Sequence, residues 1–220
     1  MGIAENLARV RERIAEACCR AGRSPGEVTV VGISKGFPAE AVAEAVAAGL
    51  ADVGENRVQE AEGKIEALAA LGLRPRWHLV GHLQTNKAKT AAGLFAILHS
   101  VDSLRLAQEL SRRASRPLAI LLEVNVAQEA SKFGFAPTEV APTLSACSTL
   151  PHLDVRGLMT VAPLSGDPEA VRPVFRALRE LRDALALREL SMGMTDDFEV
   201  AIEEGATHVR IGRAIFGDRP

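Results

Sequence analysis

Tyrosine is absent from the 220-residue chain, and the other aromatic residues and cysteine are scarce. There are seven phenylalanines, one tryptophan and three cysteines. Cys18 and Cys19 are adjacent and Cys147 lies far from both, which fits neither a disulfide framework nor the spacing of metal ligands. We therefore expect three reduced thiols and no metal site.

The chain also lacks a strong excess of charge and any long apolar run. It carries 26 Lys and Arg residues against 28 Asp and Glu residues, interspersed along the sequence. This balance gives no electrostatic case for nucleic acid or an anionic membrane as a partner. No apolar stretch is long enough to span a bilayer, and the charged N-terminus has no signal-peptide core. We expect a cytoplasmic protein that binds neither nucleic acid nor membrane.

What the sequence does contain is a regular alternation of short apolar runs and helical segments. A hydrophobic fraction of 47% is enough for a sizeable core. Apolar residues recur at helical spacing from Ile3 to Cys18, with arginine and glutamate between them, which predicts an amphipathic leading helix. The strands predicted after it are 28–33, 51–55, 77–81, 96–101, 118–126, 155–161, 190–194 and 208–212.

Eight strands that alternate with helices predict an α/β protein with a parallel sheet. The strands are mostly continuous apolar runs, as expected when both faces of a sheet are covered. Eight such units in 220 residues match a single (β/α)₈ TIM-like barrel with an extra N-terminal helix. An open doubly wound sheet is the alternative. No linker or low-complexity tract interrupts the pattern, so residues 1–220 are predicted to form one domain.

Polar residues or glycines follow nearly every predicted strand. In such barrels the functional site lies at the C-terminal ends of the strands, so these residues would converge on one rim. The first strand is followed by Ser34 and Lys35. The residues at the later strand ends are Glu55, Asn56, Gly81, His82, Gln84, Ser100, Asp102, Asn125, Met159, Thr160, Ser191, Gly193, Arg210 and Gly212.

The last two strand ends predict a site for an anion. Ser191 offers a hydroxyl, Gly193 allows close approach, and the amides of Gly212 and Arg213 can point at a phosphate. Lys35, facing a partly dry cavity, would be able to form a Schiff base with an aldehyde. Pyridoxal 5′-phosphate (PLP) carries both an aldehyde and a phosphate. Sugar phosphates offer the same two groups, so the residues alone leave both ligands open.

Each of these features also has a purely structural interpretation. A lysine just past a strand is most often a solvated loop residue. Asp196 and Asp197 are explained by capping of the helix that follows them. The histidines are expected to be structural, and they are His78, His82, His99, His152 and His208. The joint placement of many polar residues on one rim favours a binding site over these separate explanations.

The sequence resembles the YggS/PROSC family of PLP homeostasis proteins from about residue 5 to residue 218. The resemblance lies in seven segments in order, VVGISKGFP, VGENRVQEAEGKI, WHLVGHLQTNKAK, SVDS, EVNVAQEASKFGF, VRGLMTVAP and SMGMTDDFEVAIEEGATHVRIGRAIFG. It implies a fold-type III PLP barrel related to the N-terminal barrel of alanine racemase, and a monomer.

The same resemblance implies roles for individual residues. Lys35 would form the Schiff base with PLP, and Arg210 would face the pyridine nitrogen. The phosphate would be bound by Ser191 and the Gly212–Arg213 amides, with Gly193 beside them, while Asn56 and Met159 would line the ring. The sequence departs from the family at Arg213, where threonine is usual, and at Gly36, where a polar residue is usual. We expect the first change to remove a hydroxyl from the phosphate site and to keep the backbone amide, with the guanidinium either reaching the phosphate or pointing to solvent. We expect the second change to loosen the loop.

Racemisation of the alanine racemase type needs a second base, which in that family is a tyrosine from a separate C-terminal domain. This chain has no tyrosine, and its length leaves no room for that domain. An arginine at position 210 facing the pyridine nitrogen would also keep that nitrogen unprotonated and the ring a weak electron sink. We therefore expect a PLP carrier with little or no turnover, able to supply PLP-requiring apo-enzymes. The alternatives are a weak PLP-dependent amino-acid racemase and a sugar-phosphate barrel enzyme without PLP.

Overall fold

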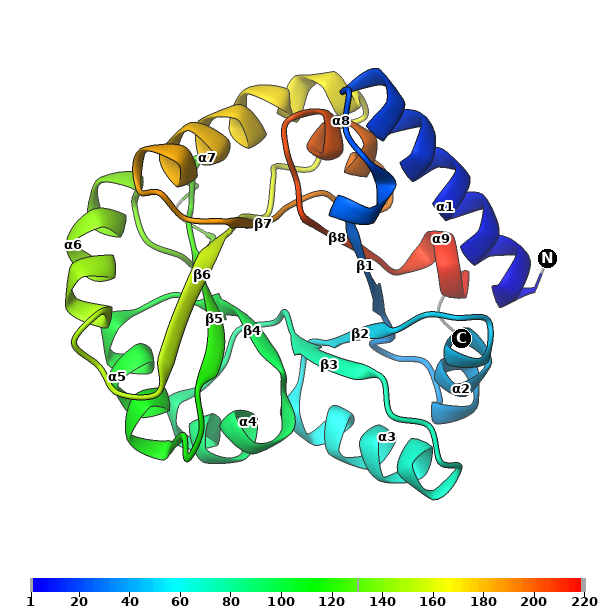
Figure 1. The fold of residues 1–220 in the computed structure, drawn as a ribbon, viewed down its shortest axis with the longest axis horizontal. Helices are drawn as coiled ribbons and strands as arrows, with labels where there is room; N and C mark the ends of the chain where they lie inside the picture. Colours follow the sequence, from blue (N-terminus) through cyan, green and yellow to red (C-terminus); the bar gives the residue numbers. More distant parts are fainter. Residues whose placement is uncertain (1, 130, 219–220) are drawn as a thin grey trace.

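Eight parallel strands close into a barrel, each paired with its neighbours in sequence order (Figure 1). This computed structural model describes residues 2–129 and 131–218. The strands are β1 (Thr29–Ile33), β2 (Asp52–Glu55), β3 (Arg76–Leu79), β4 (Ile97–Val101), β5 (Leu118–Glu123), β6 (Leu153–Met159), β7 (Glu189–Ser191) and β8 (His208–Ile211). Pairing of β1 with both β2 and β8 closes the sheet, which confirms the (β/α)₈ barrel and excludes the open doubly wound alternative.

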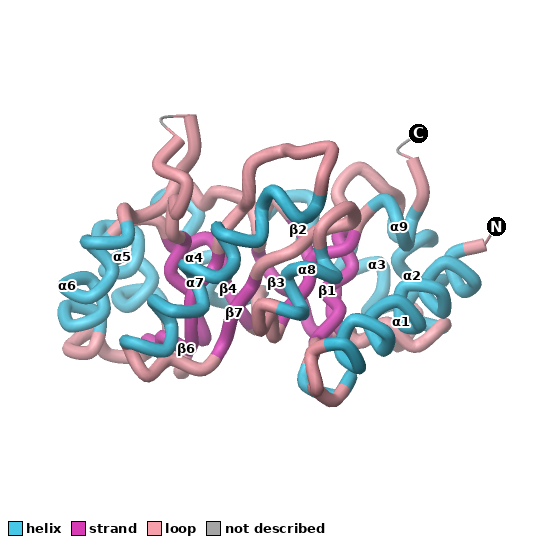
Figure 2. The backbone as a smooth tube through the Cα atoms, turned by 90° about the horizontal axis from the view of Figure 1, so that it is seen from above, coloured by secondary structure: helices cyan, strands magenta, loops and turns pink. Residues whose placement is uncertain are grey.

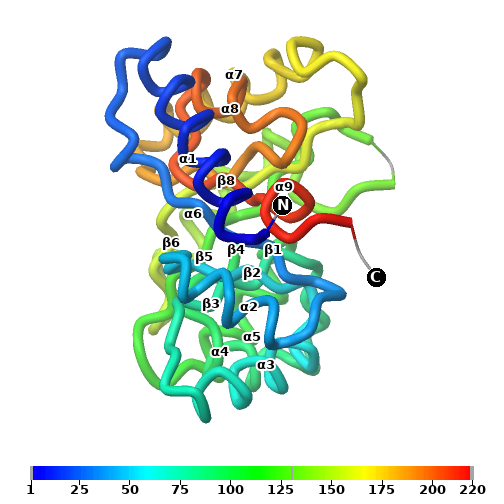
Figure 3. Tube along the Cα trace, turned by 90° about the vertical axis from the view of Figure 1, so that its right-hand side faces the viewer, coloured from blue at the N-terminus to red at the C-terminus, as the bar shows by residue number. Residues whose placement is uncertain are grey.

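Helices surround the barrel and cover the outer faces of its strands. The α-helices are α1 (Ile3–Arg20), α2 (Ala39–Ala47), α3 (Val58–Ala70), α4 (Ala88–Leu94), α5 (Leu104–Arg113), α6 (Pro137–Cys147), α7 (Arg172–Ala184), α8 (Phe198–Glu203) and α9 (Arg213–Phe216). Short 3₁₀ helices are η1 (Pro25–Glu27), η2 (Thr85–Lys87) and η3 (Pro168–Val171). Helix α1 is the predicted extra helix, and it packs against α8 and α9 (Figure 3). Within the described ranges no helix combines the length and the apolarity needed to cross a bilayer.

Several helix boundaries follow directly from local sequence. Pro38 precedes α2, and Gly49 follows it with φ +92°, a conformation that glycine adopts without a β-carbon penalty. The Ser103 side chain accepts a hydrogen bond from the Leu106 amide and caps α5. The helical segment before β7 is divided into η3 and α7, with Asp167 capping η3 through a hydrogen bond from the Glu169 amide.

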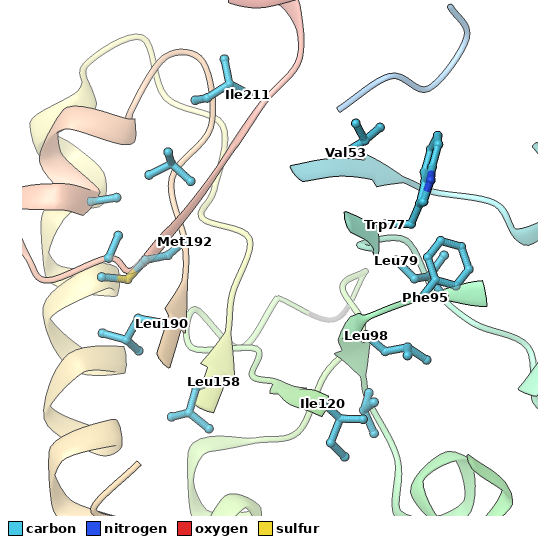
Figure 4. Packing of buried hydrophobic residues seen from close by; sticks show 14 of the residues in the cluster. Val53, Trp77, Leu79, Phe95, Leu98, Ile120, Leu158, Leu190, Met192 and Ile211 are labelled. Carbon is cyan, nitrogen blue, oxygen red and sulfur yellow. The ribbon is translucent and has the colours of Figure 1, made fainter. Parts of the chain in front are cut away.

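The main hydrophobic core is the layer between the strands and the surrounding helices. Successive residues of a strand point to opposite faces, so every second side chain projects outward. Figure 4 shows such outward side chains on most of the strands, with the centre of the barrel free of them. Those labelled on strands are Val53, Trp77, Leu79, Leu98, Ile120, Leu158, Leu190 and Ile211.

The inside of the barrel is partly polar. Buried polar side chains alternate with the outward apolar ones along β2, β3, β4, β7 and β8. They are Asp52, His78, His99, Ser191, His208 and Arg210. Barrel interiors are usually filled by layers of branched apolar residues, so this polar layer requires a complete set of internal hydrogen bonds.

One of these interior residues makes the stability depend on pH. Burial, helped by the neighbouring His78, lowers the pKa of His208 to about 4, whereas an unfolded histidine titrates near 6.5. Between these values the unfolded chain binds more protons than the folded chain. As the pH falls through that window, His208 therefore lowers the free energy of unfolding by about 3 kcal/mol.

The variant His208→Asn removes this contribution. We expect the loss of unfolding free energy between pH 7 and pH 5 to be about 2 kcal/mol smaller in this variant than in the original chain. Urea unfolding at the two pH values measures the difference. His152→Asn is the control, because His152 is exposed. Parallel pH curves for His208→Asn and the original chain would contradict the expectation.

Candidate functional site

A cavity of about 650 Å³ opens at the C-terminal ends of the strands. Figure 2 shows the barrel from the side, with the long loops gathered at one end, where the C-terminus also lies. The cavity brings together five residues that the sequence predicted, namely Lys35, Asn56, Arg210, Gly212 and Arg213. The other lining residues are Ile33, Phe37, Val80, Val161, Leu164, Met194, Thr195, Asp196, Gly217 and Asp218.

Three predicted residues lie outside this lining. Met159 and Ser191 are buried inside the barrel, and Gly193 directly precedes Met194 in the loop after β7. The hydroxyl that this loop presents to the cavity belongs to Thr195, which the sequence interpretation did not single out. The available signal was its place two residues after Gly193.

Lys35 is an exposed side chain at the edge of the cavity. The sequence predicted that Lys35 faces a partly dry cavity, and the structure places its side chain at the solvent-exposed edge of that cavity. Among the described residues, none forms a hydrogen bond or ion pair with the Lys35 amine, which leaves it available to a ligand.

Both neighbours of Lys35 are anchored to helix α3. Lys64 Nζ donates to the Ser34 carbonyl at 2.7 Å, and the Gly36 amide donates to Glu60 Oε1 at 2.7 Å. Gly36 has φ +78°, which glycine adopts without a β-carbon penalty. These contacts hold the turn on both sides of Lys35, which is the opposite of the loosening expected from Gly36.

Glu55, at the end of β2, forms hydrogen bonds with both Ser34 and Lys64. Its side chain is 0% exposed, and Oε1 accepts from Ser34 Oγ at 2.5 Å and from Lys64 Nζ at 2.6 Å. Burial raises the pKa of Glu55, although the hydrogen bonds from Lys64 and Ser34 oppose the shift. Oε2 has no partner within the part of the chain that the structure describes. Among the described residues, Lys64 is the cation that balances the buried Glu55 carboxylate. Removal of Lys64 alone would leave an unpaired buried charge and destabilise the fold.

Arg210 forms the floor of the cavity and is 5% exposed. Its guanidinium donates to Ser191 Oγ at 2.7 Å and to the Thr160 carbonyl at 2.9 Å. Burial lowers the pKa of Arg210 to about 10, while Glu123 and Asp197 oppose the shift, so the group stays charged at neutral pH. An arginine has five N–H donors, and those not used in these two contacts have no acceptor among the described residues, which leaves them available to a ligand.

Asp197 is the N-cap residue of α8, but its side chain forms no capping hydrogen bond to that helix, so the prediction of side-chain capping was wrong. Asp197 Oδ1 accepts from the Met194 amide at 2.6 Å, which closes the loop after β7. Asp196 accepts from Arg213 through both carboxylate oxygens, at 2.6 and 2.8 Å. The guanidinium of Arg213 therefore joins the loops after β7 and β8 at the cavity edge.

Gly193 lies in this loop at a position that has no room for a side chain. It has φ +89°, and a β-carbon there would lie 2.5 Å from Ala201 Cβ and 2.9 Å from Phe198 Cα. We expect Gly193→Ala to lower the free energy of unfolding by about 2–4 kcal/mol through backbone strain and overpacking. The matched control is Gly63→Ala, where a β-carbon meets nothing within 4 Å and helix propensity favours alanine. Urea unfolding measures the stability of both variants. Equal stability of Gly193→Ala and Gly63→Ala would contradict the claim that position 193 requires glycine.

The fold and the cavity together define a class of protein. Residues 3–220 match the family described as the alanine racemase N-terminal domain, so the chain is a barrel of the alanine racemase type. Within that class it belongs to the YggS/PROSC family of pyridoxal phosphate homeostasis proteins. This confirms the family predicted from the sequence.

Two relatives and one solved structure illustrate the similarity. The chain is 48% identical to the pyridoxal phosphate homeostasis protein of Aquifex aeolicus, over 100% of this chain and 99% of the relative. It is 49% identical to that of Pseudomonas aeruginosa, over 99% of this chain and 96% of the relative. PipY of Synechococcus elongatus, solved with PLP bound, is 37% identical with a TM-score of 0.84, over 98% of this chain and 100% of PipY.

Proposed function

We propose that this chain binds PLP in the cavity, as a Schiff base between its aldehyde and Lys35 Nζ, and acts in PLP homeostasis with little or no turnover. The observation that carries the proposal is the shared cavity. The Lys35 amine, which bonds to none of the described residues, and the turn at Gly212 and Arg213 lie on the same 650 Å³ space. The relatives named above are PLP homeostasis proteins, and PipY has been solved with PLP.

The phosphate-binding part of the site fits the residues present. Gly212 is the N-cap of α9, so the amides at the start of that helix have no intrahelical acceptor. Such amides favour an anion. We assign the accompanying hydroxyl to Thr195 in place of Ser191, because Ser191 is buried and bonded to Arg210. Asn56 lines the cavity, whereas Met159 is buried and does not line it.

The chemistry of this site favours storage of PLP over catalysis. Bound PLP supplies an aldehyde for reversible imine formation and an aromatic ring able to withdraw electrons. The charged Arg210 on the cavity floor opposes protonation of a facing pyridine nitrogen, which weakens that electron withdrawal. The absence of tyrosine removes the second base that the related racemases use. A monomeric state, a cytoplasmic location and PLP-requiring apo-enzymes as recipients belong to the same proposal.

Reduction with borohydride tests the proposal on the purified protein. We expect PLP to give a visible absorbance band that borohydride bleaches, with the added mass on the peptide that carries Lys35. Chiral analysis of alanine and serine after long incubation is expected to show no racemisation above a protein-free control. Racemisation that borohydride treatment abolishes would favour the racemase alternative. Absence of any PLP band would favour a sugar-phosphate ligand and overturn the proposal.

A further inference from the structure

A chain of hydrogen bonds starts beneath the cavity and runs into the barrel. Arg210 donates to Ser191 Oγ at 2.7 Å. Ser191 Oγ lies 2.8 Å from His99 Nδ1, and His99 Nε2 lies 2.9 Å from His78 Nδ1. All four side chains are buried, so each contact is shielded from water.

The chain ends at the opposite mouth of the barrel. His78 Nε2 lies 2.9 Å from Asp52 Oδ1, and Asp52 forms an ion pair with Arg76 at 2.7 Å. The Arg76 side chain is 65% exposed, whereas Asp52 is buried. The polar chain thus spans the interior from the N-terminal face to the cavity floor.

The chemistry of its two ends gives this chain one direction. Arginine can only donate, and a carboxylate can only accept. If Asp52 accepts from His78 Nε2–H, then His78 Nδ1 accepts from His99 Nε2–H. His99 Nδ1 then accepts from the Ser191 hydroxyl, whose oxygen accepts from Arg210. Every donor and acceptor in the chain is satisfied with both histidines neutral and protonated at Nε2.

The opposite direction leaves a group without a partner. If His99 donated from Nδ1, the Ser191 oxygen would accept from both His99 and Arg210. Its own hydrogen would then find no acceptor among the contacts of the described residues. An unsatisfied buried hydroxyl is destabilising, so the first direction is favoured. Burial, with the nearby His78, His208 and Arg210, also lowers the pKa of His99 well below its usual value, which keeps the ring neutral.

We propose that Asp52, His78, His99 and Ser191 are positioning residues that hold the Arg210 guanidinium in one orientation at the cavity floor. Ser191 presents a lone pair to one end of the guanidinium, and the Thr160 carbonyl holds the other. The remaining N–H groups then face the cavity. The inference deepens the proposed function and rests on it only for the effect on PLP. It assigns Ser191 to Arg210 and not to a phosphate.

The histidine tautomers test the direction of the chain without any ligand. In ¹⁵N NMR of the apo-protein at pH 7, we expect His78 and His99 to be protonated at Nε2 and unprotonated at Nδ1. Each is assigned from the signal lost in its glutamine variant. A doubly protonated His99, or a His99 protonated at Nδ1, would overturn the proposal. Failure of PLP binding would leave this result unaffected, so the two proposals fail separately.

Replacement of Asp52, whose carboxylate can only accept hydrogen bonds, tests whether these residues position the Arg210 guanidinium. Asp52→Asn introduces an amide that can also donate to His78, so we expect His99 to populate the other tautomer and PLP dissociation to become about tenfold faster. Asp52→Glu keeps a carboxylate, so we expect the His99 tautomer and the rate of PLP dissociation to remain as in the original protein. His208→Asn is the matched control. His208 lies beside His99 in the interior, but it bonds to Thr207, which is not part of the hydrogen-bond series from Arg210 to Asp52. Unchanged His99 tautomers in Asp52→Asn, or equal effects of Asp52→Asn and His208→Asn, would overturn the proposal.

Discussion

Replacement of Lys35 by alanine is expected to abolish covalent retention of PLP. The amine of Lys35 lies on the cavity and bonds to no residue in the described part of the chain, and its removal deletes the group proposed to form the imine. We expect the visible absorbance band to disappear and PLP affinity to fall at least about 100-fold, which corresponds to roughly 3 kcal/mol. Absorbance titration with PLP and mass analysis after borohydride reduction measure both effects.

Two other lysines serve as comparisons for this variant. Lys89 is exposed and lies outside the cavity, so Lys89→Ala is expected to bind PLP as the original chain does. Lys132 donates to the Val161 carbonyl at the cavity edge, which makes it the lysine to examine for a misplaced imine. Undiminished trapping of PLP in Lys35→Ala, with the original affinity, would show that another lysine holds the cofactor.

The variant Lys64→Met is expected to lower the free energy of unfolding by about 3–5 kcal/mol, because it leaves a buried carboxylate without its cation. Lys64 bonds to Glu55, to Glu60 and to the carbonyl of Ser34. Its loss also releases the turn that carries Lys35, so imine formation with PLP should slow. Urea unfolding and stopped-flow absorbance measure the two consequences.

A second substitution separates loss of charge balance from loss of packing. Adding Glu55→Leu to Lys64→Met removes the unpaired carboxylate, and we expect most of the lost stability to return. Imine formation should stay slow in the double variant, because the Ser34 carbonyl is still without its lysine. Simple addition of the two destabilisations would contradict the account of Glu55 and Lys64 as one unit.

The barrel was predictable because each strand is a short apolar run between turn residues. The boundaries of the strands were less predictable than their existence, as the end of β5 shows. Residues 118–126 are uniformly apolar apart from two positions, yet β5 ends at Glu123. Val124 then pairs with Phe135 from the following loop in an isolated bridge. A contact between segments that far apart leaves no trace in local hydrophobicity.

The cavity residues were predictable from the rule that strand ends converge, and Lys35 and Gly212 do meet there. The sequence did not predict which of these side chains reach the cavity and which lie buried inside the barrel. Ser191 and Arg210 both belong to strands, and their inward direction follows from the outward Leu190 and Ile211. That Ser191 meets His99 depends on how far the strands are staggered around the barrel, which the sequence does not specify.

The central claim is that Lys35 and the turn after β8 hold the two ends of one PLP molecule. A crystal structure of the protein with PLP tests it most directly. We predict continuous density from Lys35 Nζ to the aldehyde carbon, with the phosphate against the amides of Gly212 and Arg213 and the Arg210 guanidinium facing the pyridine nitrogen. A PLP molecule joined to another lysine, or bound with Lys35 directed into solvent, would contradict the account.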